Sequence, residues 1–138
     1  MKRFPRFALV AAFALTVSLM FSSAVVAHHS FVAQFDRNKP RTLVGPVTKL
    51  DWINPHARIF MDVKDANGHV ANWEVELAAP AILIRRGWTR SAIKIGETVT
   101  VNGSLAKDGS NLINATSLTL NNGTKVFSTA PGGDSSNP

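Results

Sequence analysis

Apolar and polar residues alternate along much of the chain, a pattern typical of half-buried β-strands. The segment TLVGPVTKLDWIN changes phase: its apolar residues up to Val47 share one face, whereas those from Leu50 onward lie on the other. A period of two that slips by one residue predicts a bulge near Thr48 or Lys49, or a strong coil at Gly45. The first strand should therefore be long and irregular.

Two further alternating segments, ARIFMDV and VANWEVEL, flank the pair Asn67-Gly68, which is a strong hairpin signal. On the second segment, Glu74 and Glu76 fall on the polar face, so we expect both carboxylates to be solvated. The sequence thus predicts three strands joined by short connections.

A single short helix follows the third strand. Pro80 suits a first helical position and Gly87 suits the residue just beyond the helix end. A second short turn is expected at 91–95, and GETVTVNGSLA and NLINATSLTL predict a further hairpin. A last short strand is expected from Lys125 to Phe127.

This order of elements predicts an all-β fold with one short helix, namely a small OB-like β-barrel of five to six strands. In that plan a bulged first strand opens the barrel and the helix lies between strands three and four. An immunoglobulin-like sandwich is the alternative, but it would need about seven short strands and no central helix.

The first 27 residues carry a different pattern, that of a secretory signal peptide. MKRFPRF is basic, an apolar run follows, and SSAVVA supplies small residues, so cleavage is expected between Ala27 and His28. A cut after Ala24 and an uncleaved membrane anchor are the alternatives. The protein is therefore expected to be periplasmic or secreted, without stable membrane insertion after cleavage.

After cleavage we expect an extended arm over 28–41, the barrel over 42–127 and a disordered tail over 128–138. Loss of the three basic residues of the signal segment lowers the formal net charge from +6 to +3, a mild value that argues against a nucleic-acid footprint. The chain has no Cys, which excludes disulfides and thiol chemistry.

Histidines offer the most specific candidate chemistry. If the mature chain starts at His28, its imidazole and free α-amine can chelate one metal ion, and His56 in INPHAR can supply a third nitrogen. Three nitrogens in a T-shaped set suit copper. His29 is an alternative ligand. The competing interpretation is that these histidines are exposed or bonded to backbone, and His69 is interpreted as a solvated turn residue.

The segment RRGWTR raises a second candidate, a ligand or partner surface formed by Arg86, Trp88 and Arg90, with Trp88 partly exposed. An aromatic ring among cations can bind nucleic acid. Export argues against that role, and a solvated helix end whose arginines offset the helix dipole explains the cations equally well.

The search for enzyme motifs finds no nucleophile elbow and no phosphate loop. We therefore expect a non-enzymatic binding protein that binds copper through its mature N-terminal histidine. A metal-free periplasmic adaptor for a protein or envelope ligand is the alternative, and a copper-dependent oxidoreductase is the third hypothesis.

Several motifs in order, AHHSF, FDRNKP, WINPHA, NWEVEL, RRGWTR and GETVTVNG, resemble an uncharacterised family of small exported proteobacterial proteins, a domain of unknown function (DUF). The likeness runs from about Ala27 to Phe127. It implies a signal peptide followed by a small β-barrel and assigns no activity. Arg58 departs from the family pattern, in which an aromatic residue is common after NPHA.

Overall fold

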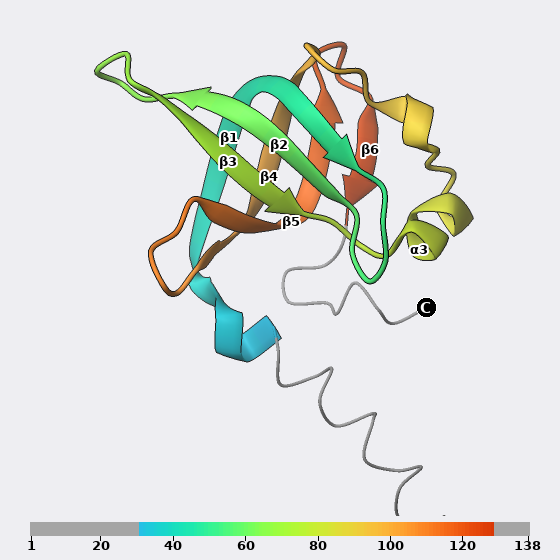
Figure 1. The fold of residues 1–138 in the computed structure, drawn as a ribbon, viewed down its shortest axis with the longest axis horizontal. Helices are drawn as coiled ribbons and strands as arrows, with labels where there is room; N and C mark the ends of the chain where they lie inside the picture. The colour runs from blue at the N-terminus through green and yellow to red at the C-terminus, as the bar shows by residue number, and fades with distance from the viewer. Residues whose placement is uncertain (1–30, 129–138) are drawn as a thin grey trace, which may run out of the picture. The chain divides into compact units, whose positions relative to one another are not determined.

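The computed structural model describes residues 31–128, and the expected signal peptide, His28, His29 and most of the expected tail lie outside these residues. Residues 31–34 are helical, and six strands, one short α-helix and one 3₁₀ turn follow them (Figure 1). In chain order they are β1 (Phe35–Asp51), β2 (Arg58–Lys64), β3 (Val70–Glu76), helix α3 (Pro80–Arg85), the 3₁₀ turn η1 (Arg90–Ala92), β4 (Thr98–Ala106), β5 (Leu112–Leu120) and β6 (Lys125–Ser128).

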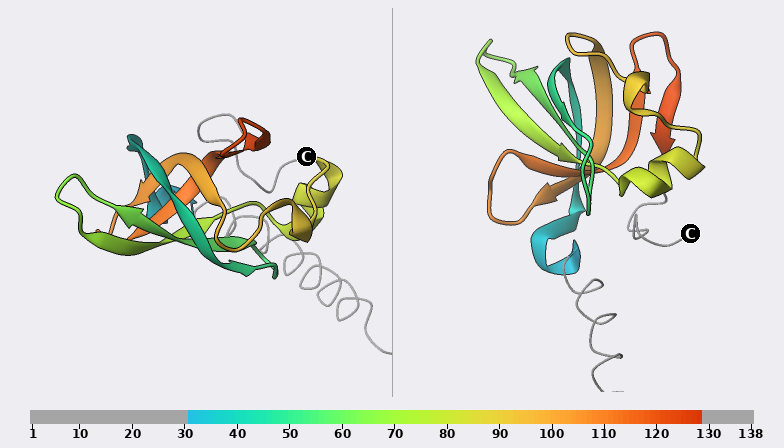
Figure 2. Two further views of the ribbon diagram at one scale, coloured as in Figure 1. Left: turned by 90° about the horizontal axis from the view of Figure 1, so that it is seen from above. Right: turned by 45° about the vertical axis from the view of Figure 1, so that its right-hand side comes forward.

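The strands pair in the order β3-β2-β1-β4-β5-β6, and an additional parallel pairing joins β3 to β5. This last pairing closes β1 to β5 into a ring, while β6 extends the sheet beyond β5 (Figures 1 and 2). Helix α3 lies between the third and fourth strands of the chain, so the expected OB-like fold is confirmed.

The long first strand is irregular where the apolar phase predicts it. Val47 pairs with Met61 and Lys49 with Phe60, so Thr48 is an extra residue in β1. The strand also begins earlier than the sequence predicts, at Phe35, because its first half pairs with β4. Residues 31–34 are helical, where the sequence analysis expects an extended arm.

The core fills the interior of the ring. Alternate residues of the strands meet there with the apolar residues of α3 and the segment after it. The largest fully buried side chains come from all five strands of the ring and from the segment 77–83: Leu43, Val47, Ile59, Met61, Val75, Leu77, Leu83, Val99, Val101, Ile113 and Leu118. Within residues 31–128, no helix is long and apolar enough to span a membrane.

Both predicted hairpin turns are present. In the β2–β3 turn, the Asp65 carboxylate accepts the backbone N–H groups of Asn67 and His69. In the β4–β5 turn, the side-chain hydroxyl and the backbone N–H of Ser110 both donate to Asp108, and these bonds lower the pKa of that carboxyl. The two loops are thus fixed locally by their own side chains.

Candidate functional site

His56 lies in the loop between β1 and β2, as its sequence context predicts. Its Nδ1 atom is 3.0 Å from the carbonyl oxygen of Leu77, and its side chain is 30% exposed. A ring whose Nδ1–H donates to a carbonyl presents Nε2 as the nitrogen that can accept a proton or bind a metal. Backbone bonds between Ala57 and the chain after β3 hold this loop in place.

Glu76 is buried beside this histidine, so the expectation of a solvated carboxylate is wrong for this residue. The side-chain amide of Asn114 donates to Glu76 Oε1 at 3.1 Å, and His56 Nδ1 lies 3.9 Å from the same oxygen. The parallel pairing of β3 with β5 aligns Glu76 with Asn114, which places the Asn114 side chain next to the carboxylate. The alternation of apolar and polar residues along β3 does not indicate which strand will pair with it.

Glu74, two residues earlier, is only partly buried and forms a 2.8 Å ion pair with Arg58. Arg58 thus contacts the neighbouring strand β3 through its side chain. Among residues 31–128 no group of three His, Asp or Glu side chains is arranged to hold a metal ion. The copper hypothesis rests on His56 together with His28 and His29, which lie outside the described residues.

Trp88 is buried, with 3% of its surface exposed, so the expected partial exposure is wrong. The helix end explains this. Gly87 has a φ of +85° and its N–H bonds to Ile84, while the N–H of Trp88 bonds to the carbonyl of Leu83 at 2.9 Å. This is a Schellman motif, in which the residue after the glycine packs back onto the helix. Arg86 and Arg90 are exposed, whereas the Trp88 ring, which lies between them in the sequence, is buried.

A hollow of about 610 Å³ opens between the first half of β1, the β2–β3 hairpin and the β4–β5 loop. We call it the Trp73 hollow. Its apolar lining includes Leu43, Val63, Ala71 and Trp73, and its polar lining includes Arg41, Thr42, Lys64, Asp65, His69 and Asn111. Helix α3 lies away from it, on the opposite side of the ring from the β2–β3 hairpin (Figures 1 and 2).

Two cations border the Trp73 hollow. The guanidinium carbon of Arg41 lies 5.4 Å from the centroid of the Trp73 ring, which is a cation–π contact. Lys64 is exposed at the end of β2. The carboxylate in this lining, Asp65, is bonded to the backbone of its own turn and lies 3.5 Å from the ring of His69.

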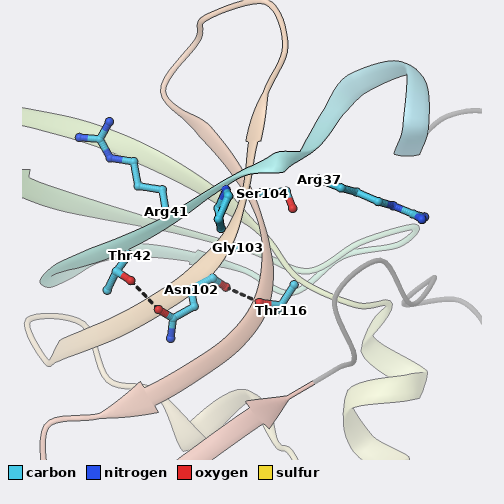
Figure 3. A pocket seen from close by; sticks show the side chains of 8 residues that line it. Arg37, Arg41, Thr42, Asn102, Gly103, Ser104 and Thr116 are labelled. Carbon is cyan, nitrogen blue, oxygen red and sulfur yellow. Dashed lines mark hydrogen bonds between the residues drawn. The ribbon is translucent and has the colours of Figure 1, made fainter.

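A smaller hollow of about 300 Å³, which we call the Thr116 hollow, lies over β1, β4 and β5 (Figure 3). Its lining is polar apart from Pro40 and Gly103: Arg37, Arg41, Thr42, Asn102, Ser104 and Thr116. Arg41 and Thr42 line both hollows. They are consecutive residues of β1, so their side chains point to opposite faces of the strand.

Strand irregularities place two of the residues that line the Thr116 hollow. In β1, Asp36 pairs with Leu105 and Pro40 with Ser104, so Arg37 belongs to a three-residue bulge. In β5, Thr116 is the extra residue between the partners of Asn102 and Gly103 in β4. A bulge redirects the side chain of its extra residue. The sequence analysis identified neither bulge, because the neighbouring residues keep no clear apolar phase.

No curated protein matches the chain. Among solved structures, it is similar to the mitochondrial single-stranded DNA binding protein Rim1 from S. cerevisiae (9% identity, TM-score 0.48, covering 60% of this chain and 93% of that one). It is also similar to the N-terminal domain of PriB from Thermoanaerobacter tencongensis (15% identity, TM-score 0.43, 60% and 96% covered) and to yeast Stn1 and Ten1 (16% identity, TM-score 0.40, 59% and 42% covered).

These likenesses concern the course of the backbone alone and assign no ligand. The expectation that the chain binds no nucleic acid stays a prediction. A family model matches residues 16–114, most of the chain and nearly all of the ring of strands. The chain belongs to the family of unknown function DUF6152.

Proposed function

We propose that this chain is an exported, non-enzymatic binding protein and that its ligand occupies the Trp73 hollow. The observation that carries the proposal is the combination of an apolar lining with two exposed cations, Arg41 and Lys64, at the edge of one hollow. Export is supported by the signal-peptide pattern of the first 27 residues.

The chemistry of this lining favours a ligand with an apolar body and an anionic group. The hollow, at about 610 Å³, lies within the size range of small-molecule sites. Arg41 already lies over Trp73 at the edge of the hollow, so its cation is next to the apolar lining where the anionic group of such a ligand would sit. Asp65 offers little competition because its carboxylate is engaged in its own turn.

A fluorescent anionic probe, anilinonaphthalene sulfonate, tests this proposal with the mature protein. We expect saturable binding that Lys64→Gln weakens by roughly two- to fivefold, the effect of one exposed charge pair. Lys125→Gln is the matched control, because Lys125 is equally exposed but lies on β6. Equal binding by both variants, with unchanged circular dichroism, would contradict the proposal.

Copper binding is the second candidate function, favoured by the contact between His56 Nδ1 and the Leu77 carbonyl. That contact presents Nε2 outward, as in metal-bound histidines, whose other ring nitrogen is usually bonded to a carbonyl or carboxylate. The remaining ligands would be the α-amine and ring of His28, with His29 as an alternative, provided that the mature chain begins at His28.

Sequencing the N-terminus of the exported protein and titrating it with Cu(II) test this candidate. We expect a start at His28 and a loss of copper affinity on His56→Gln. His69→Gln is the control, because His69 is 83% exposed at a hairpin turn. A mature start at Val25, or equal affinity in both variants, would exclude the chelate.

A further inference from the structure

The Trp73 hollow follows the edges of two strands. Its lining includes the consecutive residues 41–44 of β1 and the consecutive residues 63–66 at the end of β2 and the start of its turn. Side chains of an extended strand alternate between its two faces, so a hollow on one face would be lined by every second residue. Lining by consecutive residues therefore places the hollow along the strand edges, where backbone N–H and C=O groups are directed.

No strand within residues 31–128 pairs with either of these edges. The pairing of β1 with β2 ends at the pair Val47–Met61. Beyond that point the first half of β1 pairs with β4 alone, and the end of β2 pairs with β3 alone. The tip of the β2–β3 hairpin projects away from the rest of the ring (Figures 1 and 2). An unpaired strand edge can bind an extended chain as one more strand.

The hydrogen bonds of Val47 define which backbone groups of β1 face the hollow. Its N–H donates to the carbonyl of Glu97 and its carbonyl accepts the N–H of Gly96, so both groups are directed to the β4 side. The pairing with β4 is regular along the preceding residues of β1. Because backbone groups alternate along a strand, those of Thr42 and Val44 are directed to the opposite side, toward the hollow.

The two prolines of β1 agree with this assignment. Pro40 and Pro46 are in the same phase as Thr42 and Val44, so the missing N–H of each proline would also face away from β4. Proline is tolerated in a sheet where its nitrogen faces an unpaired edge. The prolines therefore bound a short edge at which Thr42 and Val44 can donate.

The side chains around this edge favour a particular kind of partner strand. Leu43, Val63 and Trp73 form an apolar floor. Arg41 adds a cation beside it, over the Trp73 ring. Lys64 is exposed, and it follows Val63 in β2, so its side chain points to the other face. A strand laid along β1 would direct every second side chain to the apolar floor and the others to the face of Lys64.

A single strand of nucleic acid fits this edge less well. Proteins that bind such strands without base pairing rely on exposed aromatic rings on which bases stack. The aromatic residue that lines the hollow, Trp73, is only 8% exposed and has Arg41 over its ring. A base therefore gains little here.

From these observations we infer that the ligand of the Trp73 hollow is an extended peptide segment, in which apolar side chains alternate with acidic ones, and that it pairs with β1 at Thr42 and Val44. This assignment rests on the proposed function of the hollow and names the class of its ligand. The side chains of the peptide supply the apolar body and the anionic groups, and its backbone exchanges hydrogen bonds with the edge of β1.

Methylation of the peptide backbone tests strand pairing without changing any side chain. The probe is a pentapeptide, blocked at both ends, in which glutamate alternates with valine, and calorimetric titration of the mature protein measures its binding. In a strand the N–H groups of the glutamates face one edge and those of the valines the other. One isomer is methylated at the nitrogen of the central glutamate and the other at the nitrogen of a valine.

Whichever way the peptide runs, only the isomer whose methyl group faces β1 should bind more weakly. We expect a loss of roughly three- to tenfold, the effect of one lost hydrogen bond, and no loss for the other isomer. Lys64→Gln should weaken the glutamate peptide by roughly two- to fivefold and leave the binding of a glutamine–valine peptide unchanged.

Thr42→Pro tests the same edge from the side of the protein. It removes an N–H that is directed away from β4, as the two natural prolines of β1 do, and should weaken the binding of the unmethylated peptide. Thr42→Val is the control, because it keeps the N–H and removes the hydroxyl that donates to Asn102.

Equal binding by the two methylated isomers would overturn the inference. Tighter binding of a single-stranded oligonucleotide, or self-association of the protein that Thr42→Pro abolishes, would also overturn it. If the isomers bind equally and the sulfonate probe still binds, the proposed function survives. If neither the sulfonate probe nor any peptide binds, both fail.

Discussion

At the scale of single residues, Gly45 shows how closely β1 and β2 approach each other. A Cβ atom at this position would overlap the backbone carbonyl oxygen of Asp62. That obstacle is backbone, which cannot turn aside as a flexible side chain can. The strand therefore coils over β2 at a place that only glycine allows.

We predict that Gly45→Ala lowers the free energy of unfolding by roughly 1–3 kcal/mol, the usual effect of overpacking. Val44→Ala is the control, because Val44 is the neighbouring residue and is 52% exposed. Its effect should stay within about 0.5 kcal/mol. Urea unfolding followed by circular dichroism measures both. Equal midpoints for the two variants would contradict the steric explanation.

The phase change in the sequence predicts the bulge at Thr48, because apolar residues must point to the buried face both before and after the extra residue. The same logic gives the wrong answer for Glu76. Its place in the alternation is correct, but the pairing of β3 with β5 sets Asn114 beside it, and the side chain is buried there. The pairing partner of a strand is a long-range property, and a single strand's pattern does not contain it.

At the scale of elements, α3 is short, and its end determines where Trp88 goes. The Schellman bonds of Gly87 and Trp88 turn the chain back so that the indole packs with Leu83 in the core. The glycine was recognisable as a helix end from the sequence. In a Schellman motif the residue after the glycine packs onto the helix, and this predicts that Trp88 is buried. The arginines on either side of Trp88 in the sequence suggested exposure instead.

Gly87 allows a test of this element that is free of packing effects. A Cβ atom there would meet nothing within 4 Å, so the penalty for Gly87→Ala comes from its φ of +85° alone. We predict a loss of roughly 1–2 kcal/mol in unfolding free energy. Gly87→Asn should lose less, because Asn tolerates the left-handed region better. Thermal unfolding of the three proteins measures this order, and an alanine variant as stable as the parent would refute it.

At the scale of the whole ring, the sequence predicts the order of elements and hence the OB-like fold, but not the hollows. Lys64 and Thr116 are distant in the chain from Arg37 and Arg41, and the pairing of β1 with β2 and β4, and of β4 with β5, brings their strands together. The positions of Arg37 and Thr116 depend on bulges in β1 and β5, and the hydrophobic periodicity of the sequence does not predict these bulges. The candidate site therefore had to come from the structure, whereas His56 could be selected from its sequence context.

The ring closes through its shortest junction. The parallel pairing of β3 with β5 joins only three residue pairs, from Glu74–Leu112 to Glu76–Asn114, whereas β1 and β4 pair over most of their length. At its end the buried amide of Asn114 donates to the buried carboxylate of Glu76. Removing that donor leaves a buried oxygen unsatisfied, which costs about 1–3 kcal/mol.

We therefore predict that Asn114→Ala lowers the unfolding free energy by about that amount and speeds hydrogen exchange at the β3–β5 junction more than at β1–β4. The double variant with Glu76→Gln separates the pair from the other effects of each residue. If the bond matters, the loss caused by Asn114→Ala should be smaller when residue 76 is Gln, because a neutral amide is less costly to leave unpaired than a carboxylate. Additive losses would show instead that the ring is closed by its backbone pairing and apolar core alone.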